Sequence, residues 1–305
     1  MQSRLSSLKQ KPKYTQDTFQ AIGTHWQIEL WGLASSQGKA VCQKIRDRIT
    51  IFEATYSRFR DDSLIARMAE NAGMYTLPDD AKRMLDMYQK MYHFTGGDVT
   101  PLIGQALSDA GYDKNYSLQP KSIQTVPTWE ETMRYDFPLL EIKRPALLDF
   151  GGIGKGALID IVSELIENEG AENFVVNAGG DMFCKNEQCV DVALQDPRDS
   201  SQAIGVAHIL HGALCGSAGT YRHWAQFTHI LNPHTLKSPK QNEAVWVYAA
   251  SALEADALTT ALYFASASDL CKHFRFEYAI IKAGGSLEVS NNFPAEIFTS
   301  SKGKK

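Results

Sequence analysis

A glycine-rich stretch at residues 147–160 constrains the fold of this chain more than any other feature. It reads LLDFGGIGKGALID, so an apolar run ends in Asp149 and a flexible turn follows at once. Helical periodicity begins at about Lys155, and Gly170 is placed to end that helix. We therefore expect a strand end, a turn with free backbone groups and a helix N-terminus to meet, which makes a place to bind a phosphate or a metal. The apolar face of the helix consists of Leu158, Ile161, Val162, Leu165 and Ile166.

A second stretch, at residues 174–181, repeats this pattern. A predicted strand over 174–176 ends in Asn-Ala-Gly-Gly-Asp, which again places glycines and a carboxylate, Asp181, just past a strand end. Neither stretch has the GxGxxG pattern of dinucleotide-binding folds. The lysine of GxGKG also lacks the spacer and the following Ser or Thr of a P-loop. The expected site therefore belongs to neither of these two common nucleotide-binding motifs.

The composition favours a globular protein with a large core. Apolar residues make up 44% of the 305, which is enough for one large domain or for two intimately joined lobes. The net charge of −4 gives no field that would hold nucleic acid or an anionic membrane. We predict a polar lead over 1–20, a single domain over 20–298 and a solvated basic tail over 299–305.

The sequence shows no signal for membrane insertion or export. No apolar run is long enough to span a membrane, and the first residues contain neither an apolar signal core nor a lipid-acceptor cysteine. The five cysteines include no CxxC pair, so we expect free thiols in a reducing compartment. The chain as written is predicted to be cytoplasmic, although an exported chain whose signal had been removed would look the same.

Periodicity predicts both helices and strands along the rest of the chain. A strand is expected from Trp26, and a helix is expected after an N-cap at Asp62 or Ser63. Pro101 restricts Thr100 to extended geometry. Further helices are predicted at 38–54, 79–93 and 255–262, a strand with an Asn-Pro turn at 227–235, and strands or hairpins at 139–142, 190–194, 203–210, 245–250 and 278–289.

Asp256 and Thr260 form a candidate metal site. They lie at positions i and i+4 of a predicted helix, so a carboxylate and a hydroxyl share one face and can reach a common hard cation. Mg²⁺ takes oxygen ligands and often bridges substrate phosphates, and backbone carbonyls of the turn at 152–154 can complete its shell. The alternative is that Asp256 only caps its helix or interacts with the helix dipole.

Other polar residues have both a functional and a structural interpretation. His229 is either a structural residue or, if its turn reaches the glycine loops, a proton-transfer group. Asp149 and Asp181 either bind a ligand or accept hydrogen bonds from their own turns. Lys155 either neutralises a phosphate or is solvated, and its flanking glycines favour the phosphate.

Four ordered motifs resemble those of the ApbE family, the FAD:protein FMN transferases. They are DFGGIGKG with Asp160, NAGGD at 177–181, HILNPHT at 229–235 and ADALTTA at 255–261. Gly23-Thr24, Asp62-Ser63 and the segment 98–100 fit as well, so the resemblance covers about residues 20–295. It implies an α+β, ApbE-like (T-fold-like) fold of mixed sheets packed with helices, in two intimately joined lobes.

The resemblance also implies an activity. The expected enzyme is Mg²⁺-dependent, binds FAD, transfers the FMN moiety to a Thr or Ser hydroxyl of a target flavoprotein and releases AMP. Attack on a pyrophosphate needs charge neutralisation, an in-line nucleophile and a base, which agrees with the residue types present. The resemblance implies catalytic roles for His229 and Asp256, FAD contacts at Ile22, Asp98, Val99, Thr100, Asp149 and Lys155, and metal ligation by Gly154, Asp256, Thr259 and Thr260.

Departures from the family pattern fall in the part of the site that is expected to bind the acceptor protein. Asn232 stands where Asp is usual, Leu236 stands where Gly is usual, and residues 217–221 read Ser-Ala-Gly-Thr-Tyr in place of Thr-Ser-Gly-Asp-Tyr. Asn232 and Thr220 each remove a carboxylate from the region of the proposed base. Two alternatives to transfer therefore stay open: a Mg²⁺-dependent FAD pyrophosphatase that yields FMN and AMP, and a non-catalytic FAD-binding protein.

Overall fold

The computed structural model describes residues 14–219 and 223–298 of the chain, which form both strands and helices. The strands are β1 (Tyr14–Ala21), β2 (Thr24–Trp31), β3 (Gly73–Thr76), β4 (Met133–Asp136), β5 (Leu139–Ile142), β6 (Asn173–Ala178), β7 (Asp181–Asp196), β8 (Asp199–Ala218), β9 (His223–Trp224), β10 (Phe227–Thr228), β11 (Asn242–Ala249), β12 (Glu277–Lys282), β13 (Leu287–Val289) and β14 (Ala295–Ile297). The helices are α1 (Ser35–Tyr56), α2 (Leu64–Glu70), α3 (Ala81–Thr95), the 3-10 turn η1 (Pro101–Ile103), α4 (Gly104–Asp109), α5 (Trp129–Thr132), α6 (Gly154–Asn168), α7 (Ala252–Ala261) and α8 (Ala267–Leu270). The predicted α+β class is confirmed.

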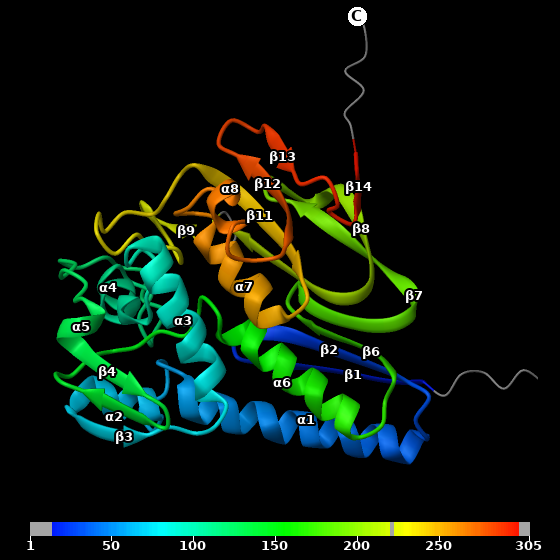
Figure 1. Ribbon diagram of the computed structural model, residues 1–305, viewed down its shortest axis with the longest axis horizontal. Helices are drawn as coiled ribbons and strands as arrows, with labels where there is room; N and C mark the ends of the chain where they lie inside the picture. The colour runs from blue at the N-terminus through cyan, green and yellow to red at the C-terminus, as the bar shows by residue number, and fades with distance from the viewer. Residues whose placement is uncertain (1–13, 220–222, 299–305) are drawn as a thin grey trace, which may run out of the picture.

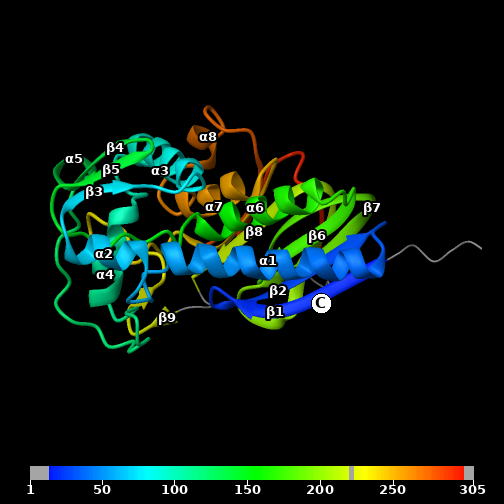
Figure 2. The ribbon, with the colours of Figure 1, turned by 90° about the horizontal axis from the view of Figure 1, so that it is seen from below.

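A nine-stranded antiparallel sheet forms the larger lobe of the described chain. Its order is β1-β2-β6-β7-β8-β11-β12-β13, and β14 also pairs with β8. One edge of β8 pairs with β7, while its other edge meets β14 at residues 205–207 and β11 at residues 213–218. Helix α6 contacts β6 and β7, α7 contacts β8 and β11, and α1 lies along β1 (Figures 1 and 2). The helices therefore cover one face of this sheet.

A smaller lobe stands beside the large sheet, on the left of Figure 1. Its strands β3, β5 and β4 pair in that order, all antiparallel, with short helices around them. The two lobes share one core, because buried side chains of both belong to a single continuous hydrophobic cluster. Its members include Trp26, Ile45, Met84, Leu140 and Leu258. The predicted pair of intimately joined lobes is therefore what the chain forms, and we expect the lobes to unfold together.

Several local predictions are confirmed by the residues that define the ends of elements. The Ser63 hydroxyl caps α2 by accepting the Ala66 N–H at 2.9 Å. Thr100 is extended before its proline, at φ −145° and ψ 141°. Gly96 ends α3 in the left-handed region at φ 62°, and Gly170 follows α6 at φ 85°.

Three stretches differ from the sequence-based expectation. Residues 14–20 of the predicted polar lead form most of β1, whose side chains are exposed or half-buried at the sheet edge, so a polar composition hides a strand there. Residues 147–149 form no strand, and the Asp149 N–H donates to the Pro101 carbonyl at 2.7 Å. The strand expected from residue 227 is only two residues long. The rest of the lead, the basic tail and the departure at Thr220 lie outside the described residues.

All five cysteines are free thiols, and Cys42, Cys184 and Cys215 are buried. No helix in the described part of the chain is long and apolar enough to cross a bilayer.

Candidate functional site

A cavity of about 610 Å³ is lined by residues of both lobes. Its walls come from the glycine turn before α6, from α7, from the loop after β10 and from segments of the smaller lobe. All the residues that the sequence predicts for a site line this cavity: Ile22, Asp98, Val99, Thr100, Asp149, Gly154, Lys155, His229, Asp256, Thr259 and Thr260. The fold thus brings together segments that are far apart in the chain.

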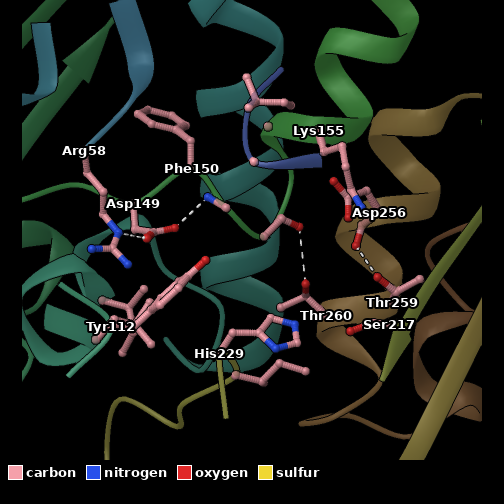
Figure 3. A pocket seen from close by; sticks show the side chains of 18 of the residues that line it. Arg58, Tyr112, Asp149, Phe150, Lys155, Ser217, His229, Asp256, Thr259 and Thr260 are labelled. Atoms are coloured by element: carbon pink, nitrogen blue, oxygen red, sulfur yellow. Dashed lines mark hydrogen bonds and ion pairs between the residues drawn. The ribbon is translucent and has the colours of Figure 1, made fainter. Parts of the chain in front are cut away.

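The glycine turn and α7 meet through direct hydrogen bonds (Figure 3). The Thr260 hydroxyl donates to the Gly152 carbonyl at 3.3 Å, and the Gly156 N–H donates to Asp256 Oδ2 at 2.9 Å. Helices α6 and α7 approach this closely because Gly156 has no side chain. A Cβ at that position would lie 2.1 Å from the Ala252 carbonyl oxygen. The two elements that carry the predicted metal ligands therefore converge.

We expect Gly156→Ala to destabilise the protein by about 1–3 kcal/mol, because the added methyl group forces α6 away from the backbone of α7. Thermal unfolding monitored by circular dichroism measures the loss as a lower Tm. Gly154→Ala is the matched control, since a Cβ there would meet Phe150 Cβ at 3.4 Å, an ordinary contact. Equal Tm values for the two variants would contradict the close approach of the helices.

The oxygen atoms at this junction suit a hard divalent cation. A carboxylate, a hydroxyl and a backbone carbonyl, from Asp256, Thr260 and Gly152, are the donors that Mg²⁺ prefers, with waters completing its shell. Burial, and then the charge of Asp181, raise the pKa of Asp256, while Lys155 opposes them. A bound cation would favour the ionised carboxylate. The described residues hold no cluster of three or more His, Cys, Asp or Glu side chains that suits a metal, so such a site depends on hydroxyl and carbonyl ligands.

The predicted metal ligands differ in how freely their oxygen atoms face the cavity. The Thr259 hydroxyl donates to the Asp256 main-chain carbonyl at 2.7 Å, and Thr259 is 1% exposed. Gly154 begins α6 and lines the cavity, but the carbonyl that Thr260 bonds is that of Gly152. Asp256, Thr260 and Gly152 therefore offer oxygen atoms at one junction, and metal ligation by Gly154, Asp256, Thr259 and Thr260 stays a prediction.

Lys155 is held by the carboxylate of the second glycine stretch. Its Nζ lies 2.6 Å from Asp181 Oδ2, and Asp181 Oδ1 accepts the Gly216 N–H at 2.8 Å. Burial lowers the pKa of Lys155, but the carboxylates of Asp181 and Asp256 more than offset this and leave the pKa raised. The ammonium group is therefore kept charged at the cavity wall. The sequence singled out both residues but did not predict that they pair.

A buried ion pair holds Asp149 beside the glycine turn. Arg58 Nε bonds Asp149 Oδ2, and the other carboxylate oxygen accepts the Gly151 N–H at 2.6 Å. The Tyr88 hydroxyl donates to the Asp149 carbonyl at 3.0 Å. These contacts fix the turn from both sides, and Asp149 interacts with its own turn, as one of its two sequence interpretations predicts.

Arg58 is part of this site, although it is not among the site residues that the sequence predicts. It is 8% exposed and lines the cavity, with its guanidinium carbon 4.2 Å from the centroid of the Phe59 ring and 4.9 Å from that of Tyr112. Its Nη2 is buried and has no hydrogen-bond partner within the described residues. A ligand acceptor in the cavity can satisfy it. The signal in the sequence was its place among aromatic residues, at Tyr56-Ser57-Arg58-Phe59.

Asp160 fixes the start of α7. Its two carboxylate oxygens accept the N–H groups of Ala252 and Leu253 at 2.7 and 2.9 Å. Burial raises the pKa of Asp160 to about 6, against the lowering effect of these two hydrogen bonds. Helix α6 therefore positions α7 at two points one turn apart, through Asp160 and Gly156.

His229 follows β10, and its ring points into the cavity (Figure 3). The loop that carries it is held at Asn232, whose Nδ2 donates to Asp98 Oδ1 at 2.7 Å. The Oδ1 of Asn232 accepts the N–H groups of His234 and Thr235 at 3.0 and 2.8 Å. An aspartate at this position would place its carboxylate beside that of Asp98, and the two negative charges would repel each other. The departure to Asn thus replaces a repulsion with a hydrogen bond.

Comparisons with known proteins find similarity over most of the chain. The family model described as "ApbE family" matches residues 22–283. The FAD:protein FMN transferase of Escherichia coli (strain K12) is 22% identical over 301 residues, which cover 88% of this chain and 84% of that protein. The FAD:protein FMN transferase of Treponema pallidum (strain Nichols) is 22% identical over 293 residues, which cover 83% of this chain and 79% of that protein.

Solved structures confirm the fold. The crystal structure of the ApbE protein from Thermotoga maritima matches with a TM-score of 0.79 at 21% identity, over 93% of this chain and 100% of that one. The flavin transferase ApbE from Vibrio cholerae matches with a TM-score of 0.76 at 17% identity, over 93% and 99% of the two chains.

Proposed function

The chain belongs to the ApbE family, and on that premise we propose that it transfers the FMN moiety of FAD to a Thr or Ser hydroxyl of a target flavoprotein, releases AMP and depends on Mg²⁺. The observation that carries this proposal is the junction of the glycine turn with α7, where Asp256, Thr260 and Gly152 offer oxygen atoms inside one cavity. Relatives named FAD:protein FMN transferase support it. The cavity volume of about 610 Å³ is typical of a site for a cofactor-sized ligand.

The proposed reaction is a displacement at phosphorus. The acceptor oxygen forms a bond to the phosphorus of the FMN moiety, and the bond from this phosphorus to the bridging oxygen of the pyrophosphate breaks. AMP leaves with that oxygen, and the proton of the hydroxyl passes to a base. Mg²⁺, when bound, supplies neutralisation of the charge on the phosphate oxygens.

Residues of the chain supply the other requirements. Asp256, Thr260 and Gly152 would hold the metal at the positive end of α6, and Lys155, kept charged by Asp181, adds a second positive charge beside it. His229 enters from the opposite loop and would take the proton of the acceptor. The cavity walls orient the two reactants, which converts an encounter between them into a positioned attack.

The test is a reaction of pure protein with FAD and MgCl₂, with and without a co-expressed candidate acceptor. We expect AMP only when the acceptor is present, and mass spectrometry should find an added FMN on one Thr or Ser. AMP release without an acceptor would assign the chain as an FAD pyrophosphatase. Tight FAD binding with no AMP in either reaction would assign it as a binding protein.

We expect His229→Gln to slow FMN transfer by about 10²–10⁴-fold, the range that general acid–base catalysis contributes, with FAD affinity unchanged. Single-turnover rates at saturating FAD and acceptor measure the effect. The control is His234→Gln on the same loop, because the His234 ring lines neither cavity; its Nε2 lies 3.1 Å from the Gly96 carbonyl and 3.8 Å from Asp98 Oδ1. Equal rates for the two variants would remove His229 from the reaction.

A further inference from the structure

A second hollow of about 630 Å³ lies next to the cavity proposed above to bind FAD, called the FAD cavity from here on, and its lining includes two lysines. It shares Asp98 and Phe264 with the FAD cavity. We call it the loop groove and define it by Asp98, Asn232, Lys237, Lys240, Gln241 and Phe264. Apart from Asp98 and Phe264, its residues have no part in the proposed transfer reaction.

We propose that the loop groove binds the acceptor segment of the target flavoprotein, as an extended stretch with acidic side chains beside the acceptor Thr or Ser. This inference rests on the proposed function, since it names where the second substrate of that reaction binds. The bound segment would run along the groove and present its hydroxyl at His229.

One continuous loop lines both hollows. Residues 229–231 line the FAD cavity, and residues 232–241 supply most of the lining of the loop groove. A chain lying in the groove is therefore led along this loop to His229. The glycine turn, Lys155 and the predicted metal ligands lie in the FAD cavity but not in the groove, so a second substrate can occupy the groove while FAD is bound.

The positive charge of the loop groove favours an acidic acceptor segment. Lys237 and Lys240 are exposed, and neither has an ion pair within the described part of the chain. Among the lining residues the carboxylate is that of Asp98, which already accepts a hydrogen bond from Asn232. The chain as a whole carries a net charge of −4, so this positive site is local. Such a site favours acidic segments and makes their binding depend on salt.

Two hydrogen bonds tie the loop that lines the groove back onto itself. The Thr228 N–H donates to the Ser238 hydroxyl at 2.8 Å, and the Asn232 N–H donates to the Lys237 carbonyl at 2.9 Å. Binding there costs little ordering of the protein. The Gln241 side chain is exposed and makes no hydrogen bond within the described residues, so its amide can pair with the backbone of an extended segment.

The test uses the double variant Lys237→Glu/Lys240→Glu. The matched control is Lys39→Glu/Lys121→Glu, which changes the net charge equally at two exposed lysines that line neither cavity. The probe is a library of 15-residue peptides with a fixed central Thr and randomised flanks, incubated with each protein, FAD and MgCl₂. Mass spectrometry then identifies the peptides that carry FMN.

We expect the FMN-bearing peptides of the wild type and of the control to be enriched in Asp and Glu. The groove variant should lose this enrichment, and its KM for an acidic peptide should rise about tenfold or more while kcat stays within about twofold. The groove proposal is overturned if the FMN-bearing peptides show no acidic enrichment, or if the groove variant keeps that enrichment. Either result leaves the proposal of FMN transfer standing.

A direct binding measurement tests the groove proposal separately from the proposal of FMN transfer. Fluorescence anisotropy with fluorescein-labelled peptides, one with Asp and one with Lys flanking the central Thr, needs neither FAD nor turnover. We expect the wild type to prefer the Asp peptide, and the groove variant to lose this preference. That result together with an absence of FMN transfer would keep the groove and overturn the transfer reaction, whereas equal binding of both peptides would overturn the groove.

Discussion

Asp256→Asn is expected to lower Mg²⁺-dependent FMN transfer by on the order of 10³-fold, because metal-ion stabilisation of the transition state is worth several kcal/mol and each 1.4 kcal/mol is tenfold in rate. The substitution removes the negative charge among the proposed ligands. It keeps a carbonyl oxygen that can accept the Gly156 N–H, the bond that Asp256 Oδ2 accepts at 2.9 Å. The helices should therefore stay in place while the metal is lost.

Thermal unfolding in EDTA and in MgCl₂ provides a readout besides activity. The wild type should gain Tm with Mg²⁺, because a ligand that binds the folded state stabilises it, and Asp256→Asn should not. In EDTA the variant should be at least as stable as the wild type, since it no longer buries a carboxylate without a cation. Asp191→Asn, at an exposed carboxylate on β7, is the control. Unchanged Mg²⁺-dependent turnover in Asp256→Asn would remove this residue from the site.

Arg58→Met is expected to lower the free energy of unfolding by about 3–5 kcal/mol, the cost of leaving a buried charge without its partner. The carboxylate of Asp149 would keep its hydrogen bond from Gly151 but would lose the guanidinium that neutralises it. Methionine keeps much of the apolar volume between the Phe59 and Tyr112 rings, so the loss reports the charge rather than a cavity. Urea denaturation measures it as a lower midpoint at a constant m value.

A double-mutant cycle tests the cause of this loss. Asp149→Asn in the Arg58→Met background should recover stability, because the second change removes the unpaired charge. Arg60→Met is the control, since Arg60 pairs with Asp62 at an exposed site and its loss should leave the midpoint unchanged. Strictly additive effects of the Arg58 and Asp149 changes would show that the ion pair is not what holds the turn.

Local patterns explain which parts of the fold and site were predictable. The helices and their caps follow from apolar spacing and from residues such as Ser63, whose effect reaches only a few positions along the chain. Asp256 and Thr260 were found because an i, i+4 spacing already fixes their common face. The glycine turn was found because its composition is unusual over a short stretch.

Features that depend on distant partners were not predictable. Nothing local distinguishes Arg58, which is buried, from Arg60, which is exposed, because the difference lies in Asp149 and the aromatic rings that surround Arg58. The strand β1 escaped notice because its sequence, at the edge of the sheet and without a buried side chain, lacks the alternation of apolar and polar residues that marks a strand. Asn232 was read as a lost charge, whereas its partner Asp98 lies far away in the sequence.

The hydrophobic cluster that the two lobes share limits how this enzyme can release its products. Separating the lobes like a clamshell would divide this cluster, in which α3 packs against α6 and α7, and would expose its side chains to water at a cost comparable to partial unfolding. We therefore expect turnover without a large hinge motion. AMP and the modified protein would instead leave through the opening of the cavity. Mutations that stiffen the surface loops around this opening should therefore slow turnover more than mutations between the lobes.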